Sequence, residues 1–285
     1  MSDDPIAESV EVHEEQQVAE LAAIRTFITS VLRTEQVTRH VRQLTVGGGD
    51  VRTFAPVSAD QFLYVLAPPP GRHELTIDAG FSWEQYDAMA PDDRPIGAYY
   101  TVRRWRPDVA ELDLLFVLHG DEDTGTAGPA AQWAARARPG DPVALWGPRS
   151  AFEPPNGAEW YLLVADDTGL PAVAAIIESL PPGTPIRVIA EVDAEEDRQP
   201  LPVADGVDVQ WCYRRGRPAG TTTMLVDAVR AMPWPAGVAY AWGGAESRCI
   251  TAVRKYVRTE RGLSRDAVSM TGYWRHDDHA DDDEH

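Results

Sequence analysis

Apolar positions near the start of the chain recur at helical spacing. Residues 15–33 place apolar side chains three or four positions apart, at Val18, Leu21, Ile24, Ile28, Val31 and Leu32. This period predicts an amphipathic helix. We expect the helix to pack on its own domain, and a dimer contact is the alternative.

A strand-like period replaces it from about Glu35 to Pro148. Five short runs are separated by turns that contain glycine and proline: HVRQLTV, QFLYVLAP, YYTVRRW, LDLLFVLHG and PVALWGP. Closely spaced strands of this kind predict an antiparallel barrel. One helix, from Pro129 to about Ala137, interrupts the series, because proline favours a first helical turn and Pro139-Gly140 ends it.

From Trp160 onward, strand-like and helix-like segments alternate. The strands are WYLLVAD, IRVIAEV, VDVQWCY, VAYAWGG and AVSMTGYW, and helical patterns lie between most of them. The alternation predicts a mainly parallel sheet covered by helices on both faces. The expected fold is therefore an N-terminal antiparallel β-barrel domain followed by an α/β domain. We place an acidic extension at residues 1–34, the barrel at 35–152, the α/β domain at 158–275 and an acidic tail at 276–285.

Acidic residues are concentrated at the two ends of the chain. The formal net charge is −19, and residues 1–24 and 276–285 carry seven and six carboxylates without any Lys or Arg. Terminal runs of this kind are typical of solvated chain ends. Nucleic acid is not an expected partner, because binding it requires cations that neutralise phosphates.

Composition also bears on the cellular location of the protein. No run approaches the roughly 18 apolar residues of a membrane helix, and the acidic N-terminus lacks the basic start of a secretory signal. Cys212 and Cys249 give no disulfide framework and suit a reducing compartment. We therefore expect a cytoplasmic protein without membrane insertion, as a monomer or weak dimer.

Several familiar catalytic motifs are incomplete or missing. The segment VADDTGL contains Asp-Thr-Gly, but an aspartic protease needs a second such loop and the chain has none. A strand-to-helix turn at the carboxyl edge of a parallel sheet, where such folds bind ligands, is the better interpretation. The sequence has no G-x-G-x-x-G, P-loop or G-x-S-x-G motif. The tail HDDHADDDEH has metal-ligand chemistry but nothing to hold it rigid, so we predict no metal site there.

Two features of the barrel half carry candidate cofactor chemistry. In Tyr100-Thr101-Val102-Arg103, a ring that can lie on a planar cofactor is followed by a hydroxyl and by a cation that can pair with phosphate. A plain barrel strand with a salt-bridged outer face is the alternative. Further on, a loop after His119-Gly120 leads to Gly128-Pro129, where the free N–H groups of a helix start make an anion site. An ordinary loop and helix start is the alternative there.

Together these segments resemble the siderophore-interacting proteins, flavin-dependent ferric-siderophore reductases related to the ferredoxin–NADP reductase superfamily. The resemblance runs from about Val37 to Arg275, in the same order of domains. Its most specific carriers are FVLHG, GPAAQWA and the terminal GYWR; the Asp-Thr-Gly-Leu-Pro turn is less specific.

The resemblance implies FAD on the barrel. Tyr100 would lie against the flavin ring, Thr101 near its N5 atom and Arg103 toward the ribityl or phosphate groups. The other implied FAD-binding residues are Val102, Phe116, Val117, His119, Ala127, Gly128, Pro129, Ala130 and Trp133. On the NADH or NADPH side it implies Asp166, Asp167, Thr168, Gly169, Gly243, Gly244, Ala245 and Glu246. Tyr273, Trp274 and Arg275 would approach the flavin or the iron complex.

The chain also departs from the family pattern. Ala98 stands where the family has an arginine, with Arg94 and Arg104 as the nearby cations that could compensate. Tyr64 stands where the family often has a lysine, and Leu115 replaces a strand acid. These changes predict that FAD binds less tightly or through altered phosphate contacts, and that the preferred iron chelate carries less negative charge.

The function that the resemblance implies is ferric-siderophore reduction. NADH or NADPH would reduce bound FAD, and single electrons would then pass to Fe(III) in a siderophore, releasing Fe(II). This chemistry requires positioning residues and no acid–base residue, which agrees with the absence of a catalytic triad. The alternatives are another flavin oxidoreductase of the superfamily and a non-enzymatic flavin- or siderophore-binding protein.

Overall fold

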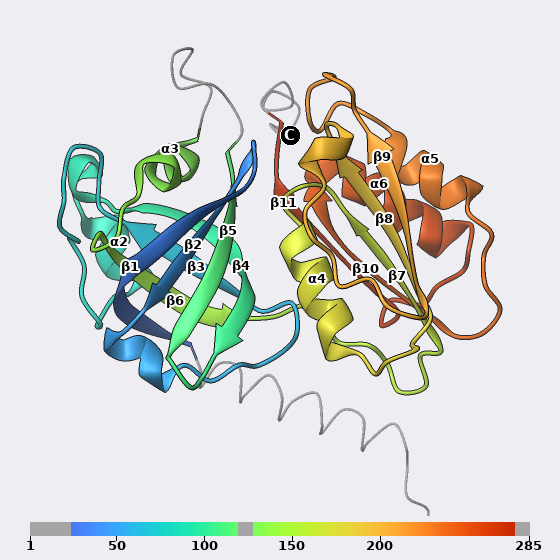
Figure 1. The fold of residues 1–285 in the computed structure, drawn as a ribbon, viewed down its shortest axis with the longest axis horizontal. Coiled ribbons are helices and arrows are strands. Elements are labelled where there is room, and N and C mark those ends of the chain that lie inside the picture. Colours follow the sequence, from blue (N-terminus) through green and yellow to red (C-terminus); the bar gives the residue numbers. More distant parts are fainter. Residues whose placement is uncertain (1–23, 119–127, 277–285) are drawn as a thin grey trace, which may run out of the picture.

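The computed structural model describes residues 24–118 and 128–276, and its strands form a closed barrel and a separate five-stranded sheet (Figure 1). The barrel half contains the strands β1 (Arg25–Thr38), β2 (Val41–Gly47), β3 (Phe62–Ala67), β4 (Ile96–Arg106), β5 (Glu111–Val117) and β6 (Pro142–Arg149), with the helices α2 (Trp83–Ala88) and α3 (Pro129–Arg136). The other half contains β7 (Trp160–Ala165), α4 (Leu170–Ser179), β8 (Ile186–Val192), β9 (Val207–Tyr213), α5 (Met224–Ala231), β10 (Ala239–Glu246), α6 (Ser247–Thr259) and β11 (Val268–Trp274). The predicted fold class is confirmed, whereas the exact domain boundaries stay predictions.

The barrel is antiparallel throughout and closes on itself. Its strand order is β1-β2-β5-β4-β3-β6, and β6 pairs with β1 to complete the ring. Alternate side chains fill the interior, among them Leu44, Leu63 and Leu114. Ala134 of α3 belongs to the same core, so this helix covers one end of the barrel.

The predicted helix over residues 15–33 is wrong where the structure describes it. Residues 25–33 belong to β1, and residues 15–23 lie outside the described residues. The segment RTFITSVLR fits both periods, and the buried residues Phe27, Thr29 and Val31 alternate as in a strand. β1 pairs with β2 and with β6, and those distant partners decide the conformation. The barrel therefore begins before residue 35.

Helix α2 was not expected from the sequence. Ser82 caps its start: the Ser82 hydroxyl accepts from the Gln85 N–H at 3.2 Å, and the Gln85 side chain accepts from the Ser82 N–H at 3.2 Å. This Ser-x-x-Gln capping box is a sequence signal for a helix start. Trp83 and Tyr86 of the helix then pack with Phe81 against the outer face of the barrel.

The second half is a parallel sheet with helices on both faces. Its strand order is β11-β10-β7-β8-β9, and every pair is parallel. Strand β7 is buried along its whole length. Trp160, Leu162 and Val164 pack toward α5 and α6, whereas the residues between them pack toward α4, which lies on the barrel side (Figure 1).

Polar contacts fix the two halves against each other. Asp60, fully buried before β3, accepts from Trp242 Nε1 at 2.9 Å and from the Ala151 N–H at 3.1 Å. Burial raises the pKa of Asp60, and these donors oppose the shift. No described helix is long and apolar enough to cross a membrane.

Candidate functional site

The sheet has a switch point beside β7. From β7 the chain builds outward to β8 and β9, then returns to add β10 and β11 on the other side. Open α/β sheets bind ligands outside the carboxyl ends of the strands at such a point. A cleft of about 720 Å³ opens here against the barrel. Its lining includes His40, Val117, Leu118 and Gly128 from the barrel half, and Asp166, Asp167, Thr168, Asp193, Arg214, Arg217, Trp274 and Arg275 from the turns that follow the strands.

Asp166 ties three elements of the switch point together. Its Oδ1 accepts from the N–H and the hydroxyl of Thr168, at 2.9 and 2.6 Å. Its Oδ2 accepts from the Glu246 N–H at 2.9 Å and from Trp274 Nε1 at 2.8 Å. One oxygen therefore fixes the turn after β7, and the other holds that turn to the ends of β10 and β11.

Asp167 belongs to a buried charge cluster with one cation. Arg214 Nη2 donates to Asp167 Oδ2 at 3.0 Å, and Arg214 Nη1 lies 3.6 Å from Glu191 Oε1. Burial raises the pKa of Asp167 to about 7, although Arg214 opposes the shift. One guanidinium shared by two buried carboxylates cannot fully compensate both charges, which explains the direction. Arg214 Nε and Nη1 are also buried without a hydrogen-bond partner among the described residues.

Glycines let the turn after β7 approach β10 closely. A Cβ on Gly169 would lie 2.1 Å from the carbonyl oxygen of Gly244, and a Cβ on Gly244 would lie 2.8 Å from the ring of Tyr273. Gly243 packs against Ile250, and Ala245 is fully buried. The structure thus gives these residues packing roles and rests the Tyr273 ring on Gly244.

Glu246 caps helix α6. Its carboxylate accepts from the N–H groups of Arg248 and Cys249, at 2.7 and 3.0 Å. A carboxylate in this place already satisfies the helix start, so the phosphates of a dinucleotide are better accommodated elsewhere in the cleft.

Tyr100 and Thr101 lie on opposite sides of β4. The Tyr100 ring packs on Phe116, with 3.9 Å between ring centroids, and Val102 points into the barrel core on the same side. Thr101 is buried, and its hydroxyl makes no hydrogen bond of normal geometry to any described residue. The phenol of Tyr273 lies close by; burial and Asp60 raise the pKa of Tyr273, and Thr101 opposes the shift.

The predicted FAD-binding residues near α3 lie close to Phe116 and to the cleft at the switch point. Trp133 lies 5.8 Å from Phe116 between ring centroids, and Gly128 and Pro129 open α3 as its N-cap and first residue. Ala130 follows in the first turn, and Val117 lies at the edge of the cleft. His119 and Ala127 lie outside the described residues.

Arg103 is paired with a carboxylate of the α/β half in this structure. It forms a two-pronged pair with Glu178 of α4, with both N···O distances at 2.8 Å, and Arg104 lies 3.2 Å from the same carboxylate. The β4–β5 ladder is irregular between Val102 and Arg104, which turns this part of the strand toward the α/β half. Arg103 therefore joins the two halves.

Residues 30–152 match the siderophore-interacting FAD-binding domain, and residues 158–277 match the siderophore-interacting protein domain. The chain belongs to the siderophore-interacting protein family.

Three relatives show how far the likeness extends. An uncharacterized protein of Mycobacterium tuberculosis is 32% identical over 86% of this chain and 88% of its own length. The ferric vibriobactin reductase ViuB of Vibrio cholerae is 27% identical over 90% of this chain and 92% of its own. The crystal structure of a siderophore utilization protein from T. fusca superposes with a TM-score of 0.78 at 28% identity, covering 90% of this chain and 94% of the other.

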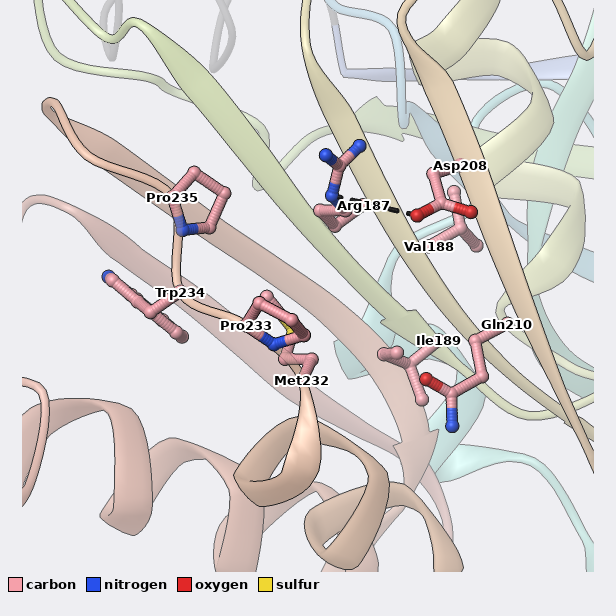
Figure 2. A pocket seen from close by; sticks show the side chains of 9 residues that line it. All are labelled: Arg187, Val188, Ile189, Asp208, Gln210, Met232, Pro233, Trp234 and Pro235. Carbon is pink, nitrogen blue, oxygen red and sulfur yellow. Dashed lines mark ion pairs between the residues drawn. The ribbon is translucent and has the colours of Figure 1, made fainter.

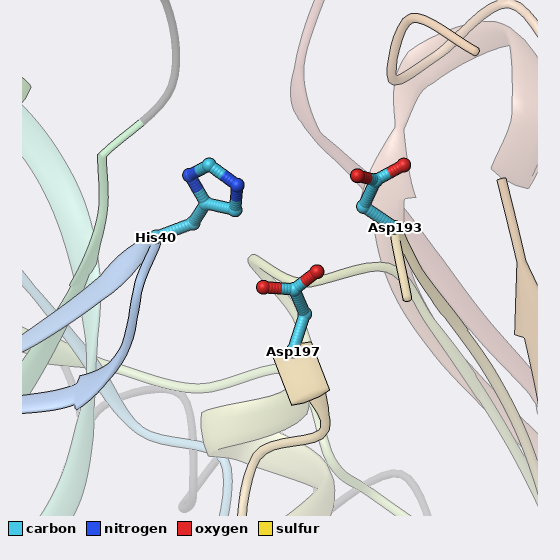
Figure 3. Close-up of side chains that lie close together, drawn as sticks. All are labelled: His40, Asp193 and Asp197. Carbon is cyan, nitrogen blue, oxygen red and sulfur yellow. The ribbon is translucent and has the colours of Figure 1, made fainter. Parts of the chain in front are cut away.

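A further polar group lies where the two domains of this siderophore-interacting protein meet. His40, Asp193 and Asp197 each bring a possible ligand atom within 4.8 Å of the others (Figure 3). Arg39 already binds both carboxylates, 2.8 Å from Asp193 and 2.6 Å from Asp197. Although burial acts in the opposite direction, Arg39 holds the pKa of Asp197 below its usual range. A guanidinium here opposes a metal ion, so the group joins the domains by ion pairs.

A smaller pocket lies away from the switch point. It has a volume of about 280 Å³ and lies between the amino-terminal halves of β8 and β9 and the segment Met232–Pro235 (Figure 2). Arg187 and Asp208 are neighbours on these two adjacent strands, 3.7 Å apart. Ligands of α/β sheets bind at the opposite, carboxyl edge, so this pocket is not part of the candidate site.

Several residues of the site could not be found from the sequence. Arg214, Glu178 and Asp60 carry no motif, and each acts through a partner far away in the chain. Arg39 and His40 lie in the turn between β1 and β2, a hairpin that the predicted helix concealed in part. No local signal reveals such pairs. The partners of Arg214 come together only when the parallel sheet forms, and those of Glu178, Asp60 and Arg39 only when the two domains dock.

Proposed function

We propose that this protein is a ferric-siderophore reductase that binds FAD on the barrel and takes electrons from NADH or NADPH. The observation that carries the proposal is the buried hydroxyl of Thr101, beside Tyr100 on β4. It is in reach of the Tyr273 phenol of the other domain but makes no hydrogen bond of normal geometry to a described residue. A buried hydroxyl without a partner is costly, and a ring nitrogen of a bound flavin would satisfy it.

The residues present fit FAD in other respects. The half-buried Tyr100 ring, backed by the fully buried Phe116, offers an aromatic face, and α3 begins nearby with free backbone N–H groups. FAD supplies the coupling between a two-electron donor and a one-electron acceptor. The chain would supply position: Thr101 would hold the ring by a hydrogen bond, Tyr100 would support it, and Tyr273 would exclude water from the domain interface.

The cleft at the switch point suits the electron donor. It reaches from Gly128 at the start of α3 to Asp166 and Arg214 at the carboxyl ends of the sheet. Arg214 Nε and Nη1, buried without hydrogen-bond partners among the described residues, are donors available to an amide or phosphate of the dinucleotide. We propose that NADH or NADPH binds here, on the side of Asp167, Thr168 and Arg214.

The iron chelate would approach from the side of Trp274 and Arg275, which line the same cleft. Siderophores hold Fe(III) through hard oxygen ligands, which bind Fe(II) less well, so one-electron reduction loosens the metal. This step needs proximity and no proton transfer by the protein. The relatives named as a ferric vibriobactin reductase and a siderophore utilization protein support this substrate class.

Absorption spectroscopy tests the proposal. We expect the purified protein, alone or after addition of FAD, to show flavin bands that bleach when NADH or NADPH is added without oxygen. A ferric siderophore should then restore the bands as Fe(II) accumulates with a ferrous-specific chelator. Bleaching without reoxidation by any ferric chelate would favour a flavin oxidoreductase with another acceptor. A protein that binds no FAD would contradict the proposal and favour a non-enzymatic binding role, which the engagement of Arg103 by Glu178 already makes the second candidate.

A further inference from the structure

A cavity on the barrel has the charge of an anion site. It has a volume of about 540 Å³ and lies between the segment that follows β3 and helix α3. We call it the arginine cavity, after Arg72, Arg136 and Arg138 in its wall, where Asp141 is the one carboxylate. The other two cavities described above have as many carboxylates as arginines in their walls. A site with an excess of arginine favours an anionic ligand.

The arginine cavity lies at the start of β4, the strand that we propose carries the flavin ring. Ile96, which forms part of its wall, shares one face of β4 with Ala98 and Tyr100, because alternate residues of a strand point the same way. Four residues of strand place Ile96 about 13 Å from Tyr100. Trp133, also in the wall, contacts Phe116, which in turn contacts Tyr100. A phosphate tethered to a ring at Tyr100 would therefore reach the cavity along one side of one strand.

The cations nearest in sequence are directed elsewhere. Arg103 and Arg104 bind Glu178, and Arg94 donates to the carbonyl oxygens of Asp87 and Met89, at 2.8 and 3.3 Å. None of these three residues lines the arginine cavity. They therefore do not supply the positive charge that is missing at Ala98.

We propose that the arginine cavity binds the diphosphate of FAD, with Arg72 and Arg136 supplying the charge that Ala98 lacks. This inference rests on the proposed FAD site. Arg72 now pairs with Asp93, but both side chains are nearly half exposed, so the pair is weak and exchanges easily for a phosphate. Arg136 lies in the last turn of α3, and one face of this helix forms part of the cavity wall. The helix therefore places the Arg136 side chain at the cavity.

Flavins of different length test the proposal without any activity assay. The apoprotein is titrated with FAD, FMN and riboflavin, followed by flavin fluorescence, for the wild type, R72Q, R136Q and R72Q/R136Q. Because each arginine would make a charge-assisted contact to phosphate, we expect FAD binding to weaken about tenfold for each arginine, or about 1.4 kcal/mol. Riboflavin affinity should not change, and the salt dependence of FAD binding should decrease. R72K/R136K, which keeps both charges, should bind FAD within a few-fold of the wild type.

A matched control separates the cavity from general effects of charge. R258Q removes an arginine from the last turn of α6 in the other domain. Its place in the helix matches that of Arg136 in α3, but it does not line the arginine cavity. The variant should bind FAD like the wild type. If R72Q/R136Q binds FAD as tightly as the wild type, or loses riboflavin equally, the cavity does not hold the diphosphate, whereas the proposed function stands. If the variants weaken NADPH or NADH binding and leave FAD unchanged, the phosphate belongs to the donor and the inference is wrong. If the wild type binds no flavin, both proposals fail.

Discussion

At the scale of single residues, Thr101 is the side chain whose environment makes most sense with a cofactor bound. Its hydroxyl is buried and makes no hydrogen bond of normal geometry to a described residue, although the Tyr273 phenol is in reach. We expect T101V to leave the apoprotein as stable as the wild type or about 1 kcal/mol more stable, because a buried unsatisfied hydroxyl is removed. FAD should stabilise the variant less than the wild type. Thermal unfolding with and without FAD measures both effects.

Thr29 provides the matched control for this prediction. It is a buried barrel threonine whose hydroxyl donates to the Gly47 carbonyl oxygen at 2.7 Å. T29V should destabilise the apoprotein by about 1 kcal/mol and leave the stabilisation by FAD unchanged. If T101V destabilises the apoprotein as T29V does, the Thr101 hydroxyl has a partner in the protein, and the argument for a flavin contact loses its basis.

The buried cluster around Asp167 makes stability depend on pH. Its pKa of about 7 lies above the ordinary value of 3.8, so the folded protein binds this proton more tightly than the unfolded chain does. The stability that this proton contributes is complete below about pH 4 and is lost as the pH rises to 7. We expect D167N to gain stability relative to the wild type between pH 5 and pH 8, as judged by unfolding temperatures.

Asp113 should behave in the opposite way. Although burial acts against it, the Arg106 pair and the Thr45 hydroxyl hold the pKa of Asp113 below its usual range. Its contribution is therefore present above the ordinary pKa and is lost in acid. D113N should be destabilised at pH 7 and lose that deficit below about pH 4. If the difference in unfolding temperature between D167N and the wild type is the same at every pH between 5 and 8, Asp167 is ionised over that whole range. The prediction for Asp167 is then wrong.

At the scale of elements, the close approach of α4 to β10 depends on Gly169. A Cβ there would meet the Gly244 carbonyl oxygen at 2.1 Å, and backbone on both sides leaves no flexible atom to move. We expect G169A to destabilise the protein by about 2–3 kcal/mol, within the range for overpacking. G80A, in an exposed turn where the nearest atom is a side-chain oxygen at 3.1 Å, should change stability by less than about 0.5 kcal/mol. Equal effects of the two changes in chemical denaturation would contradict this packing argument.

The elements also show where local pattern suffices. All five strands and all three helices predicted after residue 158 are present, because each has its own unambiguous period and a buried face. The strand β1 was mistaken for helix, since RTFITSVLR satisfies either period until its neighbours β2 and β6 are known. Helix α2 was missed although its Ser82–Gln85 capping box is visible in the sequence.

At the scale of the whole molecule, Arg103 and Glu178 hold the domains together. Glu178 is about one-third exposed, so the pair is only partly screened by water. A double-mutant cycle with R103Q and E178Q should give a coupling energy of about 0.5–1 kcal/mol in chemical denaturation. The same cycle with R230Q and D227N, an exposed pair within α5, should give less, because both partners are more than half exposed. A coupling energy of zero for Arg103 and Glu178 would leave the polar ties between the domains to Asp60 with Trp242 and to Arg39 with Asp193 and Asp197.

The sequence by itself determined the fold class, the order of the domains, the family and the identity of the strand that carries Tyr100 and Thr101. These follow from hydrophobic period and short contiguous motifs, which are local properties of a chain. Only the tertiary structure decided that β1 is a strand, that Arg103 faces Glu178, and that Arg72 and Arg136 line one cavity beside the strand of Ala98. Each of these depends on residues tens of positions apart becoming neighbours, and the free energy of such contacts exists only after the barrel has closed and the two domains have docked.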